Sequence, residues 1–230
     1  MEQLYNGFTL DIAPGVFPLS TDSMLLAEFV RQARGGRFLD LGSGCGTLGV
    51  LLCAADPRCH VTGLELDETA HRCAVENIRR NGLQDRMESI CADLRQLPSS
   101  IIPGSFRSCV SNPPYFSGGP ASQATPLARR EDCCAPADLF RAASRALKYG
   151  GNFYLVHRPE RLAELISAGA AFGLEAKRLR LVHHKEGGPV TLVLLDFRLG
   201  GKPGLLFEEV CLFNKDGSPT PYYRRVYHLD

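Results

Sequence analysis

The chain has 230 residues, of which 44% are hydrophobic and 22% charged, a balance typical of a globular protein rather than of a disordered chain. Lysine and arginine number 26 and aspartate and glutamate 25, so the formal net charge is +1. This charge excludes a protein that binds nucleic acid through bulk positive charge, so any nucleic-acid contact has to come from a local patch.

Short apolar strands alternate with helical segments through the middle of the chain, which predicts an α/β fold. Seven strands are expected, at residues 37–41, 60–65, 87–91, 106–111, 152–156, 175–183 and 190–199. Helices are expected between them, at residues 47–55, 68–81, 138–149 and 160–172. Strands joined through a helix should pair in parallel, because a parallel crossover needs about a dozen residues or more. No helix separates the last two strands, so they should pair antiparallel.

Capping and stop residues set several of these boundaries. Asp67 is expected to cap the helix that follows it, and Gly82 to end that helix. Gly150-Gly151 is expected to end the next long helix. The pattern divides the chain into an N-terminal extension (1–36), a core (37–199) and a C-terminal tail (200–230).

The first residues lack the basic start and apolar centre of a secretory signal, and no run approaches the roughly 18 apolar residues of a membrane span. We therefore expect a cytoplasmic protein without membrane segments. The nine cysteines include no Cys-x-x-Cys pair, so we expect reduced thiols that pack as small apolar side chains, and no metal site.

A glycine-rich turn, Asp40-Leu41-Gly42-Ser43-Gly44-Cys45-Gly46, follows the first core strand and opens a helix. Glycines allow a tight turn there and let the backbone approach a ligand closely. The spacing is Gly-x-Gly-x-Gly, without the Lys-Ser/Thr of a phosphate-binding loop, which disfavours a dinucleotide. The turn by itself fits several kinds of nucleotide-binding fold.

Two acidic residues stand at the ends of the next two strands. Glu65 ends the second, where a carboxylate can accept both hydroxyls of a ribose, and Asp93 lies just beyond the third, within reach of an adenine amine. Ligands of open α/β sheets lie at the carboxyl ends of strands, so these acids and the glycine turn should share one edge. The alternative is that both acids are helix caps or solvated turn residues.

The motif Asn112-Pro113-Pro114-Tyr115 follows the fourth strand. Prolines stiffen the chain and lack N–H groups, so nearby carbonyls are free to accept hydrogen bonds. The Asn112 oxygen and the Pro113 carbonyl can then accept the two hydrogens of one planar amine, while Tyr115 stacks on the ring that carries it. Two such acceptors favour the pyramidal amine, whose lone pair attacks an electrophile held in line. The alternative is a stiff turn with a surface tyrosine.

Taken together, DLGSGCG, LELD, CADL and SNPPY resemble the amino-methylating branch of the class I S-adenosylmethionine-dependent methyltransferases, over roughly residues 20–200. Within that branch, TDSMLLA before the glycine turn and ARRE after the NPPY motif resemble the bacterial tRNA1(Val) adenine-37 methyltransferases. The resemblance implies a Rossmann-like fold, with a mostly parallel seven-stranded sheet, helices on both faces and an antiparallel last strand. It also implies S-adenosylmethionine as cofactor and RNA, a tRNA anticodon loop, as partner.

The resemblance also assigns roles to single residues. Thr21 and Asp22 would close the N-terminal extension over the methionine end of the cofactor, Glu65 would bind its ribose and Asp93 its adenine. The full set of implied cofactor contacts is Thr21, Asp22, Asp40, Gly42, Gly44, Gly46, Glu65, Asp93 and Asn112. The target base would be held by the catalytic motif Asn112, Pro113, Pro114 and Tyr115.

Basic residues gather in two places that could contact RNA. Residues 127–161 carry seven basic and four acidic side chains, including Arg129 and Arg130 close to the NPPY motif. Residues 177–185 alternate basic and apolar positions, with Arg178 and Arg180 among them. Arginines around a stacking tyrosine suit a splayed-out base from a single-stranded loop, so we predict that Arg129 and Arg130 bind the substrate. Solvated surface charge is the alternative for both groups.

The favoured activity is methyl transfer to the N6 amine of an adenine in RNA. A glutamine side chain of a translation release factor is a second acceptor, because the NPPY motif also serves amide nitrogens, although that family carries a larger helical N-terminal domain. DNA adenine is disfavoured because no recognition domain is evident. A non-catalytic RNA-binding protein would need a broken site, and an NAD-dependent oxidoreductase is the remotest alternative.

Overall fold

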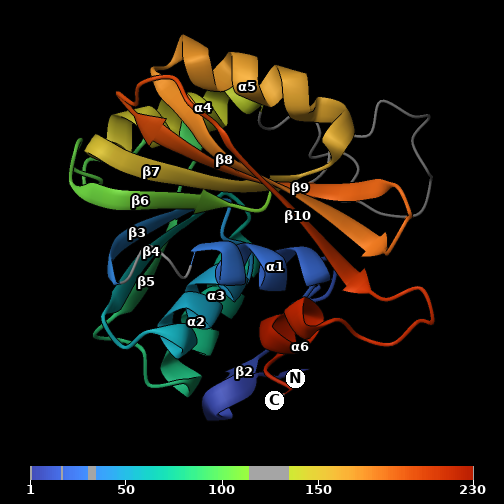
Figure 1. The fold of residues 1–230 in the computed structure, drawn as a ribbon. Coiled ribbons are helices and arrows are strands. Elements are labelled where there is room, and N and C mark those ends of the chain that lie inside the picture. Colours follow the sequence, from blue (N-terminus) through green and yellow to red (C-terminus); the bar gives the residue numbers. More distant parts are fainter. Residues whose placement is uncertain (1, 17, 31–34, 114–134, 230) are drawn as a thin grey trace.

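The computed structural model describes residues 2–16, 18–30, 35–113 and 135–229 (Figure 1). The strands in these ranges are β1 (Glu2–Gln3), β2 (Thr9–Leu10), β3 (Gly36–Leu41), β4 (Cys59–Glu65), β5 (Met87–Cys91), β6 (Phe106–Ser111), β7 (Leu147–His157), β8 (Leu174–Lys185), β9 (Val190–Leu199) and β10 (Leu206–Phe213). The α-helices are α1 (Thr21–Val30), α2 (Thr47–Ala55), α3 (Glu68–Arg80), α4 (Pro136–Ala146), α5 (Leu162–Ala171) and α6 (Pro221–Tyr227). Short 3-10 helices include η1 (Tyr5–Gly7), η3 (Leu94–Gln96) and η5 (Pro159–Arg161).

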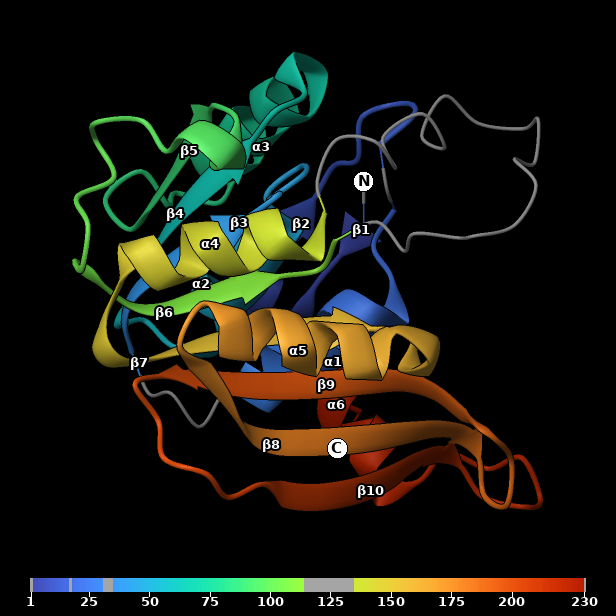
Figure 2. The same cartoon turned by 90° about the horizontal axis from the view of Figure 1, so that it is seen from above.

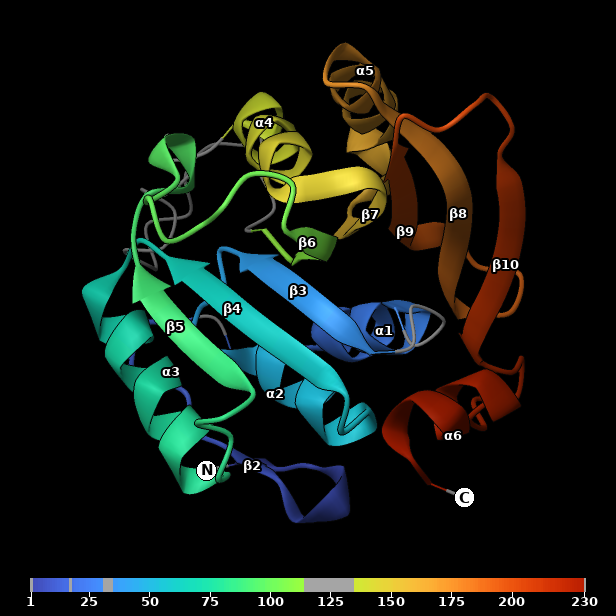
Figure 3. The same cartoon turned by 90° about the vertical axis from the view of Figure 1, so that its left-hand side faces the viewer.

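Eight strands form one twisted sheet in the order β10-β8-β9-β7-β6-β3-β4-β5 (Figure 3). Among them β9 alone runs antiparallel, between β7 and β8. The predicted mostly parallel sheet with an antiparallel final pair is therefore confirmed. The predicted count of seven was one short, because β10 of the C-terminal tail adds to the edge in parallel with β8. The residue pattern of β10 does not resemble a buried strand, because Leu206 and Phe207 are exposed and the inward-facing Glu208 is charged.

Helices cover both faces of the sheet, as Figures 1 and 2 show. α1, α2, α3 and α6 lie on one face, over a core that includes Phe29, Phe38 and Leu51. α4 and α5 lie on the other, over a core built around Phe140 and Phe197, whose rings meet edge to face at 4.9 Å. The apolar runs of the central strands follow from burial on both faces.

Local signals placed most boundaries correctly. α2, β5 and β6 have the predicted limits. Asp67 caps α3 by accepting a hydrogen bond from the Ala70 amide at 2.8 Å, and Gly82 follows the helix with a left-handed φ of +64°.

The predicted boundary between the helix at 138–149 and the next strand was wrong. α4 ends at Ala146, and β7 begins at once with Leu147 paired to Phe106. Gly150-Gly151 therefore lies inside β7, where the pairing with β6 shifts register. A Cβ at Gly151 would lie 2.9 Å from two backbone oxygens, so these glycines serve an irregular strand pairing rather than a helix stop.

The C-terminal tail packs on the helical face that holds α1. α6 buries Tyr222 and Val226, and the Tyr223 ring stacks on Tyr227 at 4.4 Å. The ring of His228, just beyond α6, stacks on Tyr5 at 3.6 Å, so the two ends of the chain lie together (Figure 1).

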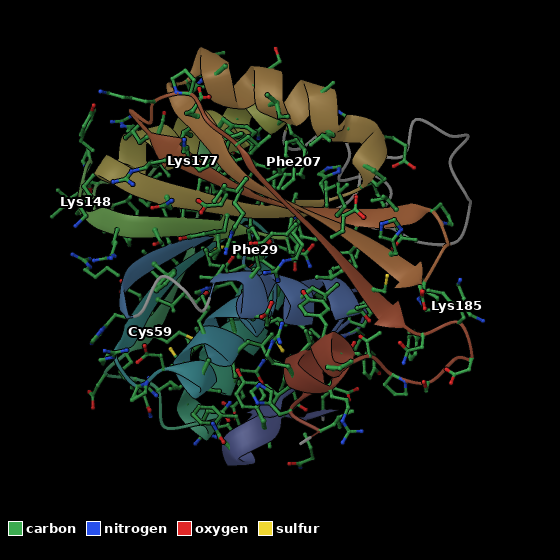
Figure 4. The ribbon with its side chains drawn as sticks, viewed as in Figure 1. Phe29, Cys59, Lys148, Lys177, Lys185 and Phe207 are labelled. Carbon is green, nitrogen blue, oxygen red and sulfur yellow. The ribbon has the colours of Figure 1, made fainter. Side chains whose placement is uncertain are left out.

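Arg178 and Arg180 point inward from β8, so neither belongs to a solvated basic patch. Arg180, 7% exposed, pairs with both Glu28 of α1 and Glu208 of β10 at 2.6 Å. Arg178 donates to the Phe29 carbonyl at 2.7 Å, and its guanidinium lies 3.8 Å from the centre of the Phe29 ring. Figure 4 shows Phe29 between α1 and the sheet. This ionic cluster fixes α1 against the sheet.

Candidate functional site

The glycine-rich turn lies where the sheet reverses its strand order. β3 pairs with β4 on one side and with β6 on the other, and α2 leaves directly from the turn. Ligands of open α/β sheets bind beyond the carboxyl ends of the strands at such a point. The Ser111 hydroxyl donates to the Leu41 carbonyl at 2.7 Å, which holds the ends of β6 and β3 together.

The backbone of this turn requires its glycines. Gly42, Gly44 and Gly46 have φ values of +75°, +56° and +81°, a region that side chains disfavour. Space is also missing at Gly46, because a Cβ there would lie 2.9 Å from Met87 Cε. The Gly42 amide donates to the Leu64 carbonyl at 2.9 Å and so anchors the turn to β4.

A cleft opens in front of the turn. Its lining comes from the segment before α1, from α1, from the turn and the start of α2, and from the end of β6: Val16, Pro18, Ser23, Asp40, Gly42, Ser43, Gly44, Cys45, Thr47, Leu48 and Asn112. Of the predicted cofactor contacts, the cleft brings together Asp40, Gly42, Gly44 and Asn112. Thr21, Asp22, Gly46, Glu65 and Asp93 are not part of its lining.

Asp40 is the unusual acidic residue in this cleft. Its side chain is 1% exposed, and neither carboxylate oxygen has a hydrogen-bond partner among the described residues. Burial, reinforced by the nearby Glu65 carboxylate, raises the pKa of Asp40 to about 8. An isolated buried carboxylate is costly, and a bound cation or hydrogen-bond donor would relieve that cost. Asp40 therefore favours a ligand with positive charge.

Glu65 supports the turn directly. Its two carboxylate oxygens accept the backbone amides of Gly44, at 2.8 Å, and of Asp67, at 2.7 Å. Each oxygen keeps a second lone pair, so the predicted contact with ribose hydroxyls remains chemically open. That contact stays a prediction.

Asp93 caps η3 and is engaged by Arg95. It accepts the Arg95 amide at 2.9 Å and pairs with the Arg95 guanidinium at 2.6 Å. That hydrogen-bonded pair lowers the pKa of Asp93. The helix-cap alternative thus describes the contacts of Asp93 seen here, and its proposed contact with adenine stays a prediction.

Asn112 lies at the cleft with one end of its amide already bound. Its Nδ2 donates to the hydroxyl of Ser23 at 2.9 Å, across 89 positions of sequence. Asn112 is among the residues that line the cleft, and its Oδ1 atom keeps its capacity to accept a hydrogen bond. Pro113 beside it is buried. Pro114, Tyr115, Arg129 and Arg130 lie outside the described residues, so their predicted roles stay predictions.

The TDSMLLA segment forms the start of α1. The Thr21 hydroxyl lies 2.8 Å from the Tyr227 hydroxyl of α6, so it contacts the tail. The cleft residue from this segment is Ser23, which the sequence analysis did not assign. A signal was present, because Ser23 is the polar residue at the head of the apolar run Met24–Ala27.

A second set of residues that the sequence analysis missed fixes the N-terminal segment over the turn. Asn77, fully buried on α3, accepts the Asp11 amide at 2.8 Å and donates to the carbonyls of Asp11 and Cys45. One turn later, Asn81 accepts the Thr9 amide and donates to the Thr9 carbonyl. Two asparagines at i and i+4 on an amphipathic helix were the available signal. They join this segment, α3 and the glycine turn.

Within the described ranges, no helix is long and apolar enough to cross a membrane. The same residues contain no group of three or more His, Cys, Asp or Glu side chains suited to a metal ion.

Comparison with known proteins agrees with this geometry. The methyltransferase small domain model matches residues 8–168. A tRNA1(Val) (adenine(37)-N6)-methyltransferase from Bacteroides fragilis is 31% identical over 185 residues, covering 78% of this chain and 76% of that protein. A predicted O-methyltransferase from Agrobacterium tumefaciens superposes with a TM-score of 0.75 at 23% identity, covering 90% of this chain and 96% of that one. The T. thermophilus 16S rRNA N2 G1207 methyltransferase in complex with AdoMet and guanosine gives a TM-score of 0.61 at 22% identity, covering 86% of this chain and 49% of that one.

These matches confirm the predicted family and fold. The two solved structures share the fold, and the family model spans the N-terminal segment, the glycine turn and the NPPY motif. The chain therefore belongs to the methyltransferase small domain family and, within it, to the family of the tRNA1(Val) (adenine(37)-N6)-methyltransferases.

Proposed function

We propose that the protein transfers a methyl group from S-adenosylmethionine to the exocyclic N6 amine of an adenine in tRNA, at position 37 of tRNA1(Val). The observation that carries this proposal is the Asn112 amide. Its donor end is held by Ser23 at 2.9 Å, so its oxygen remains for a donor in the cleft. An exocyclic amine is such a donor.

The cleft suits S-adenosylmethionine on chemical grounds. This cofactor carries a sulfonium and an ammonium group, and the unpartnered Asp40 carboxylate at the cleft would be stabilised by either positive charge. Gly42 and Gly44 leave the backbone open to close approach, and Glu65 holds the Gly44 amide in place. The residues that would hold the cofactor are therefore Asp40, Gly42, Gly44 and Glu65. When bound, S-adenosylmethionine supplies a methyl group activated by the sulfonium charge.

The residues after β6 would then prepare the acceptor. Asn112 Oδ1 and the Pro113 carbonyl would each accept one hydrogen of the adenine amine, which favours the pyramidal nitrogen and aims its lone pair. Positioning supplies much of the acceleration. No base has to act before transfer, because the amine proton becomes acidic once the new N–C bond forms. Tyr115 would stack on the base, and Arg129 and Arg130 would contact the RNA around it.

Adenine in tRNA is favoured over the glutamine of a release factor. The Bacteroides fragilis relative is named for the adenine of tRNA1(Val), and the match spans 78% of this chain. Both acceptors present an amine with two hydrogens, so the Asn112 geometry alone suits either. The names of the relatives support the adenine acceptor.

The test is methyl transfer from radiolabelled S-adenosylmethionine to separate pools of tRNA, rRNA, DNA and release-factor protein. We expect label in tRNA, recovered after nucleoside digestion as N6-methyladenosine. Asn112→Ala should abolish transfer and leave S-adenosylmethionine affinity within a few-fold. Asn214→Ala, which removes the same side chain from the loop after β10, should behave as wild type. Label in protein alone, or full turnover by Asn112→Ala, would overturn the proposal.

A further inference from the structure

The amide of Asn112 has two orientations that differ in chemistry but hardly in shape. Turned one way it presents an oxygen, which accepts, and turned the other way it presents an NH2 group, which donates. A donor facing the hydrogens of the target amine would repel them. Only one orientation therefore serves methyl transfer, and in that orientation the NH2 group needs a hydrogen-bond acceptor of its own.

Ser23 is placed to supply that acceptor. It sits in the first turn of α1, is 5% exposed, and shares the cleft lining with Asn112. Its hydroxyl oxygen accepts Nδ2–H of Asn112 at 2.9 Å, an ordinary hydrogen-bond length. With the NH2 end bound on that side, Oδ1 takes the opposite position.

The rest of the fold keeps the Ser23 hydroxyl in place. The Arg180 guanidinium of β8 pairs with Glu28, and this ion pair ties one face of α1 to β8. At the first residue of the helix, Thr21 lies 2.8 Å from the Tyr227 hydroxyl of α6. Asn112 itself follows β6, whose end is bonded to β3 through Ser111. Both partners of the Ser23–Asn112 bond thus sit on anchored elements, which is what a precise orientation needs.

We propose that Ser23 is a positioning residue for the reaction: it holds the Asn112 amide with its oxygen toward the acceptor amine. The inference rests on the proposed function, since the orientation matters only if Asn112 accepts a hydrogen bond from substrate. It adds the start of α1 to the amine-binding machinery. Ser23 touches neither reacting atom and acts through Asn112.

The decisive variant is Ser23→Ala, measured with full-length protein, S-adenosylmethionine and tRNA. We expect kcat to fall about tenfold, the factor that corresponds to one hydrogen bond of about 1.4 kcal/mol. Cofactor affinity, measured by calorimetry, should stay within twofold. Ser108→Ala is the matched control, because it removes another buried hydroxyl from β6 without touching Asn112, and its kcat should equal that of wild type. An unchanged kcat in Ser23→Ala, or a loss matched by weaker cofactor binding, overturns the positioning role.

A second pair of variants separates orientation from packing. The carboxylate of Asn112→Asp presents an oxygen whichever way it turns, so it needs no partner to orient it. Adding Ser23→Ala to Asn112→Asp should therefore change kcat by less than twofold. A tenfold loss in both backgrounds would mean that Ser23 acts through the packing of α1, and would overturn the inference. If Asn112→Ala methylates tRNA at the wild-type rate, the amine clamp of the proposed function fails as well. If Asn112→Ala loses activity but Ser23→Ala keeps the kcat of wild type, the positioning role alone fails.

Discussion

Replacing Asp40 by Asn should make the protein without cofactor more stable at alkaline pH and make it bind S-adenosylmethionine more weakly. Asp40 is buried without a hydrogen-bond partner in the described part of the chain, and burial raises its pKa from 3.8 to about 8. The unfolded chain releases this proton near pH 4, whereas the folded chain keeps it until about pH 8. Between these values the folded state binds more protons, so its stability falls as pH rises.

The loss of folding stability depends on the pH range between the unfolded and the folded pKa of Asp40. Each pH unit in the window between the two pKa values removes about 1.36 kcal/mol. From pH 5 to the folded pKa of about 8 this sums to about 4 kcal/mol. Asn cannot ionise, so Asp40→Asn should escape this loss, and its nearly identical size should keep the shape of the site.

Denaturant unfolding of the cofactor-free protein at pH 5 and at pH 9 measures this directly. The stability difference between Asp40→Asn and wild type should grow by about 4 kcal/mol between the two conditions, in favour of the variant. The exposed Asp85 gives a control, since Asp85→Asn should follow the pH curve of wild type. Calorimetry should show weaker binding of S-adenosylmethionine by Asp40→Asn, because the carboxylate that faces its positive charge is gone. Parallel pH curves for wild type and Asp40→Asn would refute the argument that burial makes ionisation of Asp40 costly.

Three further changes probe the rest of the site. Glu65→Ala should weaken S-adenosylmethionine binding by removing the acceptor of the Gly44 amide, and calorimetry with unchanged affinity would place the ribose elsewhere. Charge reversal at Arg129 and Arg130 should raise the KM for tRNA with little change in cofactor affinity; a KM equal to that of wild type would remove both from the RNA path. Arg180→Ala should lower the free energy of unfolding by about 1.5–3 kcal/mol, because it removes the buried guanidinium that pairs with the half-buried Glu28 and Glu208. A urea midpoint shifted by the equivalent of less than about 1 kcal/mol would contradict this.

Much of the fold could be predicted because neighbouring residues determine it. The Asp67 cap, the Gly82 stop and the apolar run of β6 each carry their own signal within a few positions. The strand at 206–213 carries no such signal, since Glu208 faces inward only because Arg180, 28 positions away, meets it there. Alternation of charged and apolar residues in β8 likewise indicated a solvated side, although that side packs against α1 and α6.

The site likewise combines residues that local motifs predict with contacts that only the tertiary structure determines. Asp40, Gly42, Gly44 and Asn112 stand in compact motifs at the ends of strands, and parallel pairing alone brings them to one edge of the sheet. Which atoms of those residues remain free for a ligand is a tertiary property. Glu65 and Asp93 were predicted as ligand contacts, yet the backbone amide of Gly44 and the Arg95 side chain already use part of their capacity.

The Asn112 amide shows why a motif does not predict which atoms of a residue are free to bind a ligand. The letters NPPY specify an acceptor and a donor on one side chain, and they do not specify which end faces the substrate. The NH2 end is accepted by a hydroxyl 89 residues earlier, on a helix whose own position depends on an ion pair to β8 and on a contact with α6. A motif therefore supplies the chemical groups of this site, while the packing of α1 places the acceptor that the NH2 end of Asn112 needs.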